Sequence, residues 1–427
     1  MARTEECILY RNFDNGEVLD IMTSLMNNYE AGEEGFENRK EEFFHMAGSL
    51  VEMAGMYGFS GNLWHTYLTQ LLVNHENAFS TASEIRGAVE GSINHLALHD
   101  FGIFKELYDF DLAVFDSAFG TDCADFLCNY VNTGCNSKVY NQRICDRICD
   151  MSKTLAEAST VEEFMADMVQ FYKDFGVGKL GLNKAFRIEH GKDGKPVIAP
   201  ITRIAHVNLD DLVGYEIPKQ KLIENTEAFV RGRKANNCLL FGDAGTGKSS
   251  SIKGILNRYY DEGLRIIEVY KHQFQDLNDV IAQIKNRNYK FILYMDDLSF
   301  EEFEIEYKYL KAIIEGGLGI KPQNVLIYAT SNRRHLIREK FSDKRELDDD
   351  LHSNDTVQEK LSLVARFGVT IYYGSPDKKE FQNIVRVLAD KYHIHMPEAD
   401  LLLEANKWEL NHGGLSGRTA TQFIANL

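Results

Sequence analysis

The stretch Phe241-Gly242-Asp243-Ala244-Gly245-Thr246-Gly247-Lys248-Ser249-Ser250 decides the fold of this chain. It follows an apolar run that predicts a short buried strand, and it leads into apolar residues at helical spacing. A glycine-rich turn between a strand and a helix suits phosphate, because backbone N–H groups and the helix N-terminus point at the anion. We therefore predict that residues 242–250 bind a nucleotide, with Lys248 reaching the β- and γ-phosphates and Ser249 ligating Mg²⁺.

Length, charge and cysteine content limit the classes of protein that the chain can belong to. Its 427 residues allow two or three domains, and its net charge of −17 disfavours a general polyanion-binding protein. The N-terminus lacks the apolar run of a signal peptide, and no stretch approaches the about 20 apolar residues of a membrane span. Seven cysteines fit a reducing compartment better than a disulfide framework. We expect a cytoplasmic protein without a membrane span.

Residues 1–185 predict a mostly helical N-terminal domain. Apolar residues at helical spacing begin at Val18, and two patterns predict capping boxes, Thr81-x-x-Glu84 and Thr160-x-x-Glu163. Each predicted helix has one apolar face, so we expect the helices to bury these faces against one another.

Five cysteines lie close together in this half of the sequence, at positions 123, 128, 135, 145 and 149. They could form a zinc or iron–sulfur site, but their spacing is irregular and includes no Cys-x-x-Cys pair. Free cysteine is among the most buried residue types, so we favour packed interior positions over a metal site.

The pattern of the sequence changes after residue 185. Apolar runs flank Asp193-Gly194, which predicts a hairpin or linker over residues 186–207. Residues 208–374 alternate short apolar strands with helices, which predicts an α/β domain with a parallel sheet between helices. Residues 375–427 predict a small helical lid.

Polar residues follow the predicted strands, where ligands of parallel sheets gather. Asp296 ends the strand 290–295 and is a candidate Mg²⁺ ligand with Ser249. Asp297 is the nearest candidate to orient the attacking water, with Glu301 and Glu302 as alternatives. Three further residues could contact the γ-phosphate or the attacking water: Asn332, Arg366 and Arg418.

These landmarks, in this order, resemble the AAA+ ATPases from about residue 209 to the C-terminus. The resemblance implies that residues 242–249 are the Walker A loop and that 291–297 are the Walker B strand. It also implies that Asn332 is sensor one, Arg366 the arginine finger and Arg418 sensor two. The fold implied is a P-loop three-layer sandwich with a C-terminal helical lid, binding ATP and Mg²⁺.

A closer resemblance is to a bacterial family of predicted AAA+ ATPases filed as a domain of unknown function, number eight hundred and fifteen. It rests on motifs such as Asp296-Asp297-Leu298-Ser299-Phe300-Glu301 and Tyr328-Ala329-Thr330-Ser331-Asn332-Arg333. Further matching segments are 212–214, 224–226, 235–237, 245–250, 310–312 and 315–318. The family implies ATP binding and hydrolysis and names no physiological substrate.

One position departs from most AAA+ proteins, which have glutamate where this chain has Asp297. The aspartate carboxylate is one methylene shorter, a difference of roughly 1.5 Å. The Asp-Asp form also occurs in replication initiators and helicase loaders, so it is compatible with hydrolysis. It suggests a slow, switch-like enzyme rather than a fast motor.

The leading hypothesis is an ATPase that couples ATP binding and hydrolysis to a conformational switch or to remodelling of a partner. It would assemble with copies of itself, with Arg366 acting in trans, and would contact an unknown protein partner through its N-terminal domain. A DNA-associated loader, suggested by the basic run Arg333-Arg334-His335, is an alternative that the overall acidity disfavours. A non-hydrolysing ATP sensor is a second alternative. A P-loop small-molecule kinase is a third, which the candidate sensor and finger residues oppose.

Overall fold

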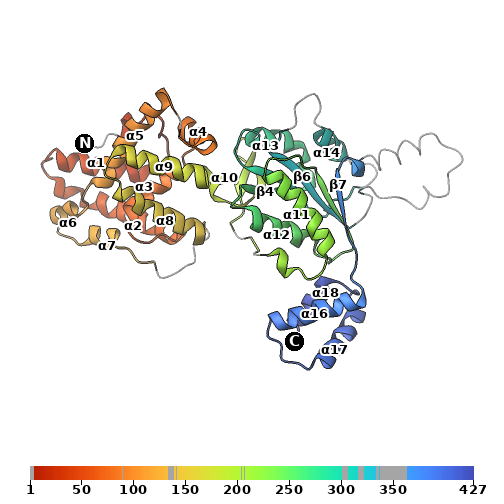
Figure 1. Ribbon diagram of the computed structural model, residues 1–427. Coiled ribbons are helices and arrows are strands. Elements are labelled where there is room, and N and C mark those ends of the chain that lie inside the picture. The colour runs from red at the N-terminus through yellow and green to blue at the C-terminus, as the bar shows by residue number, and fades with distance from the viewer. Residues whose placement is uncertain are drawn as a thin grey trace. The chain divides into compact units, whose positions relative to one another are not determined.

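The computed structural model describes residues 4–88, 90–132, 139–140, 142–202, 204–205, 207–300, 306–315, 322–332, 336 and 363–427. The chain divides into two compact units, Met1–Asn183 and Lys184–Leu427 (Figure 1). None of the helices in these ranges has the length and apolar character needed to cross a bilayer.

The first unit is helical, as the sequence predicted. Two short 3-10 helices cover Thr4–Glu6 and Phe36–Arg39. Its α-helices are α1 (Glu17–Glu30), α2 (Lys40–Tyr57), α3 (Leu63–Asn74), α4 (Ala78–Arg86), α5 (Ser92–Asp109), α6 (Ala113–Phe119), α7 (Cys123–Cys128), α8 (Gln142–Glu157), α9 (Val161–Phe175) and α10 (Gly178–Leu182).

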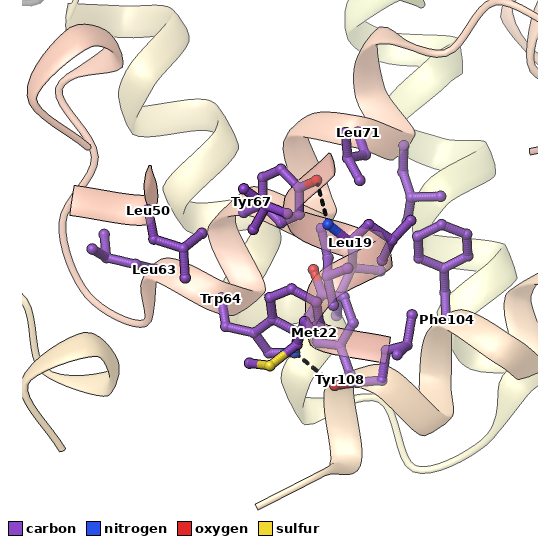
Figure 2. Packing of buried hydrophobic residues seen from close by; sticks show 14 of the residues in the cluster. Leu19, Met22, Leu50, Leu63, Trp64, Tyr67, Leu71, Phe104 and Tyr108 are labelled. Atoms are coloured by element: carbon purple, nitrogen blue, oxygen red, sulfur yellow. Dashed lines mark hydrogen bonds between the residues drawn. The ribbon is translucent and has the colours of Figure 1, made fainter. Parts of the chain in front are cut away.

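Helix α3 is the centre of the first unit's core, since ten of its twelve residues are buried. Figure 2 shows the buried side chains around Trp64 and Tyr67 of this helix. The Trp64 indole N–H donates to the carbonyl of Leu107 at 2.9 Å, and the Tyr67 hydroxyl accepts from the Leu19 N–H at 3.1 Å. The two large aromatic residues therefore bury apolar surface while their polar atoms keep partners.

The N-terminal segment is attached to this core by a buried carboxylate. Asp100 of α5 is fully buried, and its carboxylate accepts hydrogen bonds from three consecutive backbone N–H groups. These come from Ile8 at 2.9 Å, Leu9 at 2.6 Å and Tyr10 at 3.0 Å. Backbone donors, together with the His99 ring Nδ1 at 3.0 Å from Oδ1, satisfy the buried carboxylate, an arrangement that the sequence analysis missed.

Of the two predicted capping boxes, one is confirmed and one is wrong. Thr160 and Glu163 cap α9 reciprocally. Helix α4 instead begins at Ala78 with a box formed by Asn77 and Ser80. Thr81 lies inside that helix, because Asn77 accepts from the first N–H groups and starts the helix one turn earlier.

The cysteines form no metal cluster within the described ranges, where no three potential ligands come together. Cys123 and Cys128 lie on α7, while Cys145 and Cys149 lie on α8. The buried Cys145 thiol donates to the carbonyl of Gly58 at 2.8 Å. Cys135 lies outside the described residues.

The second unit contains a seven-stranded sheet in the order β2-β1-β4-β5-β6-β3-β7, which is parallel except for β2. The strands are β1 (Ala185–His190), β2 (Pro196–Pro200), β3 (Cys238–Gly242), β4 (Leu264–Glu268), β5 (Lys290–Met295), β6 (Val325–Ser331) and β7 (Val369–Tyr373). Its helices are α11 (Glu216–Val230), α12 (Lys248–Tyr259), α13 (Leu277–Ile284) and α14 (Glu306–Glu315). Short 3-10 helices cover Leu209–Asp211 and Lys271–Asp276.

Both faces of the central strands β3, β5 and β6 are buried, as is usual for parallel strands. Leu240, Ile292 and Tyr328 belong to one core with α11 and α12, while the neighbouring residues Leu239 and Leu293 are also fully buried. Because successive strand residues point to opposite faces, burial of both sets means that both faces are covered. The predicted α/β class, with a parallel sheet among helices, is confirmed.

The predicted hairpin over residues 186–207 is part of this sheet. Strands β1 and β2 pair antiparallel around Asp193-Gly194, with Phe186 opposite Pro200. Strand β1 also pairs parallel with β4, where Ala185 lies opposite Ile266. The hairpin therefore extends the sheet at its edge.

The C-terminal lid has a core of its own. It consists of α16 (Lys378–Lys391), α17 (Glu398–Asn411) and α18 (Gly417–Ala425) (Figure 1). Phe381 and Val385 of α16 and Phe423 of α18 are buried together, and Val213 packs against them from the main part of the unit.

Candidate functional site

The loop after β3 has the backbone that the glycine pattern predicts. Strand β3 ends at Gly242 and α12 begins at Lys248. Gly242, Gly245 and Gly247 have φ angles of +137°, +76° and +88°, which L side chains rarely adopt. A Cβ on Gly242 would lie 2.0 Å from the carbonyl oxygen of Tyr373 in β7. Only glycine fits where the loop leaves the sheet.

Lys248 lies across this loop. Its ammonium donates to the carbonyls of Gly242 at 2.9 Å and Asp243 at 2.6 Å, and the residue is almost fully buried. Burial lowers the pKa of Lys248, while the nearby carboxylates of Asp243, Asp297 and Asp296 oppose that shift. The Lys248 ammonium is thus held against the backbone of the loop, near three aspartate carboxylates.

The Asp243 side chain faces the chain that follows β7. Its carboxylate accepts from the hydroxyl of Ser375 at 2.9 Å and from the backbone N–H of the same residue at 2.8 Å. The Ser375 hydroxyl, followed by that N–H, lowers the pKa of the Asp243 carboxyl. Asp243 therefore links the phosphate loop to the segment that enters the lid.

The Asp296 carboxylate accepts hydrogen bonds from three hydroxyl groups. Its Oδ1 accepts from Ser249 at 2.8 Å, Tyr294 at 2.7 Å and Thr330 at 2.5 Å. Burial raises the pKa of the Asp296 carboxyl, but these hydrogen bonds outweigh burial and the net shift is downward. The two predicted Mg²⁺ ligands, Ser249 and Asp296, are therefore in direct contact.

Asp297 follows in an unusual backbone conformation, with a φ of +50°. Its N–H donates to the Thr330 hydroxyl at 2.9 Å, and its carboxylate accepts from the Asn332 amide at 2.7 Å. Strands β5 and β6 pair in parallel, so the residues that follow both strands come together at one edge of the sheet.

The lid contacts the phosphate loop at Arg418. The Arg418 N–H donates to the Gly245 carbonyl at 3.1 Å, and a Cβ on Gly245 would lie 3.0 Å from the Arg418 Cβ. Ser416 caps α18 by accepting from the Thr419 N–H at 3.1 Å. The first turn of α18 is therefore set directly against the loop.

A cavity of about 630 Å³ lies between these elements. Its polar lining includes loop residues 244–250 and Asp296, Asp297, Asn332 and Arg418. It is also lined by residues that the sequence analysis did not single out for this site, among them Leu212, Val213, Tyr215, Ile384 and Leu388. A volume of this size with both polar and apolar lining suits a nucleotide with its base. Gly242 and Asp243 are not among the described residues that line it.

Arg366 is placed differently from the other candidate residues. It is half-buried in the segment that precedes β7 and is not among the described residues that line this cavity. Glu301 and Glu302 lie outside the described residues. So does the basic run Arg333-Arg334-His335 that motivated a DNA-associated function.

The chain is similar to one protein family and to several solved structures. Residues 182–427 match the family model described as "Protein of unknown function (DUF815)". The Thermotoga maritima RuvB Holliday junction branch migration motor is similar at a TM-score of 0.33 and 16% identity, over 52% of this chain and 72% of that one. A point mutant of Thermotoga maritima RuvB gives a TM-score of 0.37 and 19% identity, over 52% of this chain. The match spans 65% of the mutant chain, just under two thirds of its length. Among curated proteins, none matches this sequence.

Proposed function

The chain belongs to the family described as "Protein of unknown function (DUF815)", and from the residues that line its cavity we propose that it is a Mg²⁺-dependent ATPase. ATP binding and hydrolysis in the cavity of the Lys184–Leu427 unit would drive a conformational switch or remodel a partner. The observation that carries this proposal is the lining of that one cavity. The phosphate loop, Asp296, Asp297, Asn332 and Arg418 all face it, although they come from three strands and the lid.

The residues present fit ATP and Mg²⁺. The loop has no side chain at Gly245 or Gly247, so its backbone can lie close to phosphate, and Lys248 supplies a nearby positive charge. Ser249 and Asp296 would hold the metal, since hard oxygen ligands suit Mg²⁺. When bound, Mg²⁺ neutralises charge that develops on the phosphate oxygens. Leu212, Val213, Ile384 and Leu388 would surround the base.

Asp297 and Asn332 would position the attacking water. Both line the cavity, and the Asn332 amide holds the Asp297 carboxylate at 2.7 Å. A carboxylate that accepts a hydrogen bond from a fixed amide keeps lone pairs for a water proton.

The hydrogen bond between Asn332 and Asp297 also supports a second candidate function, a sensor that binds ATP without turnover, because the Asp297 carboxylate already has a partner. A turnover assay separates the two functions, since bound ATP that never becomes ADP identifies the sensor.

Arg366 would complete the site of a neighbouring copy of the chain. It does not line the cavity of its own chain, and an arginine supplied in trans is worth about 10³–10⁵ in rate, or about 4–7 kcal/mol of barrier. Mixing Arg366→Ala protein with Asp297→Asn protein should therefore restore activity through hybrid interfaces. A mixture that stays inactive at every ratio excludes the shared site.

The helical first unit would recruit the protein partner of this ATPase. Affinity capture from cells with the Asp297→Asn variant should retain the ATP-bound state and any partner held by it. A DNA-associated function remains the alternative, and labelled DNA that does not shift at low salt would remove it.

The decisive test is calorimetric titration of ATP into folded Lys248→Ala protein. Loss of hydrogen bonds from a charged donor to phosphate should weaken binding about 10- to 150-fold. Lys253→Ala is a matched control, because this exposed lysine lies on the same helix and does not line the cavity. Undiminished binding by the Lys248 variant would refute the proposed function.

A further inference from the structure

Thr330 contacts three consecutive residues that follow strand β5, at the carboxyl end of the sheet. It lies near the end of β6 and is 1% exposed. Its hydroxyl meets Asp296 Oδ1 at 2.5 Å and the Asp297 N–H at 2.9 Å, and its carbonyl accepts from the Leu298 N–H at 2.7 Å. The side chain and the backbone of this one residue therefore hold the whole turn that carries both carboxylates.

The directions of these hydrogen bonds are fixed by the groups involved. A carboxylate only accepts and a backbone N–H only donates, so the hydroxyl proton points at Asp296 and a lone pair faces Asp297. The second bond holds Asp297 at a φ of +50°, a left-handed conformation that L-residues adopt infrequently. A single hydroxyl thus orients one carboxylate and fixes the backbone that aims the next.

We propose that Thr330 is a positioning residue that couples the metal ligand Asp296 to the water-orienting residue Asp297. The inference rests on the proposed function, in which Ser249 moves from Asp296 to the metal. The Thr330 and Tyr294 hydroxyls then remain on Oδ1 and keep the carboxylate oriented. Because Asp297 has a short side chain, the direction of its carboxylate depends on the backbone that Thr330 fixes.

If the Thr330 hydroxyl had only a structural role, removing it would lower stability without a specific loss of metal affinity. Thr226 provides the matched control for that case. Thr226 is also fully buried and also has two partners, the Leu222 carbonyl at 2.8 Å and the Tyr328 hydroxyl at 3.0 Å. It lies in α11 and does not line the cavity. Thr226→Val and Thr330→Val remove the same group from two buried positions in one unit.

The experiment measures Mn²⁺ affinity of the ATP-bound full-length protein by electron paramagnetic resonance, together with the melting temperature and steady-state turnover. Thr330→Val should weaken Mn²⁺ binding about 10- to 100-fold, the usual effect of losing a group that orients a metal ligand. It should also lower kcat at saturating metal while the KM for ATP changes little. Thr330→Ser keeps the hydroxyl and should restore both quantities, whereas Thr226→Val should change only the melting temperature.

The measured Mn²⁺ affinities decide the inference. Wild-type Mn²⁺ affinity in Thr330→Val protein, or an equal loss in Thr226→Val protein, overturns it and leaves the proposed function intact. If Thr330→Val does not fold, the smaller Thr330→Ala variant is tested in the same way. Wild-type protein that binds no Mn²⁺–ATP refutes the proposed function and this inference together. Wild-type protein that binds Mn²⁺–ATP without turnover refutes hydrolysis alone, and the Mn²⁺ measurement still decides the role of Thr330.

Discussion

Replacing Gly242 by alanine tests how the phosphate loop is attached to the sheet. The residue has a φ of +137°, and an added Cβ would lie 2.0 Å from the Tyr373 carbonyl oxygen. Cβ atoms essentially never approach another atom within 3.0 Å, so the backbone of β7 or of the loop must move by about 1 Å. That carbonyl also accepts from the Asp243 N–H at 3.0 Å, and the movement would break this bond.

The Gly242→Ala substitution should lower the free energy of unfolding in two ways. The backbone conformation alone costs a non-glycine residue about 1–3 kcal/mol. Overlap in a packed region adds about 1–3 kcal/mol. Gly263 separates the two parts, because its φ is +93° but an added Cβ has nothing within 4 Å. Gly263→Ala should therefore lower the free energy of unfolding through the backbone conformation alone. Gly242→Ala should lower it through both the backbone conformation and the steric overlap.

Hydrogen exchange followed by mass spectrometry measures the difference locally. An additional 1–3 kcal/mol should make the Asp243 amide exchange about 5- to 150-fold faster in Gly242→Ala than in Gly263→Ala protein. The melting temperature should differ in the same direction, by about 2–4 °C per kcal/mol. Equal exchange and equal melting in the two variants would show that β7 does not constrain the loop.

Three other predictions concern both units. Trp64→Phe should lower the free energy of unfolding by about 1–3 kcal/mol in urea, because the buried Leu107 carbonyl loses its donor; unchanged stability would contradict this. Asp100→Ala should expose residues 8–10 to fast hydrogen exchange, because three N–H groups lose their acceptor, whereas retained protection would show that the segment is held otherwise. Asp296→Asn should flatten the pH dependence of the melting temperature. The pKa of Asp296 is lowered on folding, so its contribution is complete above the ordinary value of about 4 and is lost as the pH falls through the folded pKa. The difference from wild type should shrink in acid, and a difference that grows would contradict the assignment.

Local patterns in the sequence were sufficient to predict the fold class. The glycine loop lies between a strand and a helix, and β5 and β6 are short apolar runs that lead into polar residues. These signals are local because they depend on the strand and helix periods of adjacent residues. The error at Thr81 has a local cause too, since Asn77 is the stronger cap and lies one turn earlier.

The convergence of the candidate residues could also be anticipated, because the carboxyl ends of parallel strands meet at one edge. The contact between Ser249 and Asp296 follows from that rule. The hydrogen bonds between the Asp100 carboxylate and the backbone of residues 8–10 could not be predicted, because they join positions about 90 residues apart without any periodic signal. The left-handed backbone of Asp297 is equally hidden, since Thr330, its partner, lies 33 residues further along the chain.

The lid and the phosphate loop are joined closely enough that their positions depend on each other. The Arg418 N–H binds the Gly245 carbonyl, and Gly245 lies so near that a side chain there would press on Ser416 and Arg418. On the other side of the loop, Asp243 binds Ser375 in the segment that leads into α16. Hydrogen bonds therefore connect the loop both to the segment that leads into α16 and to the first turn of α18. Any change in the loop that follows from phosphate binding or release must alter these contacts or move the lid with it, which gives the proposed ATPase a direct route from nucleotide state to conformation.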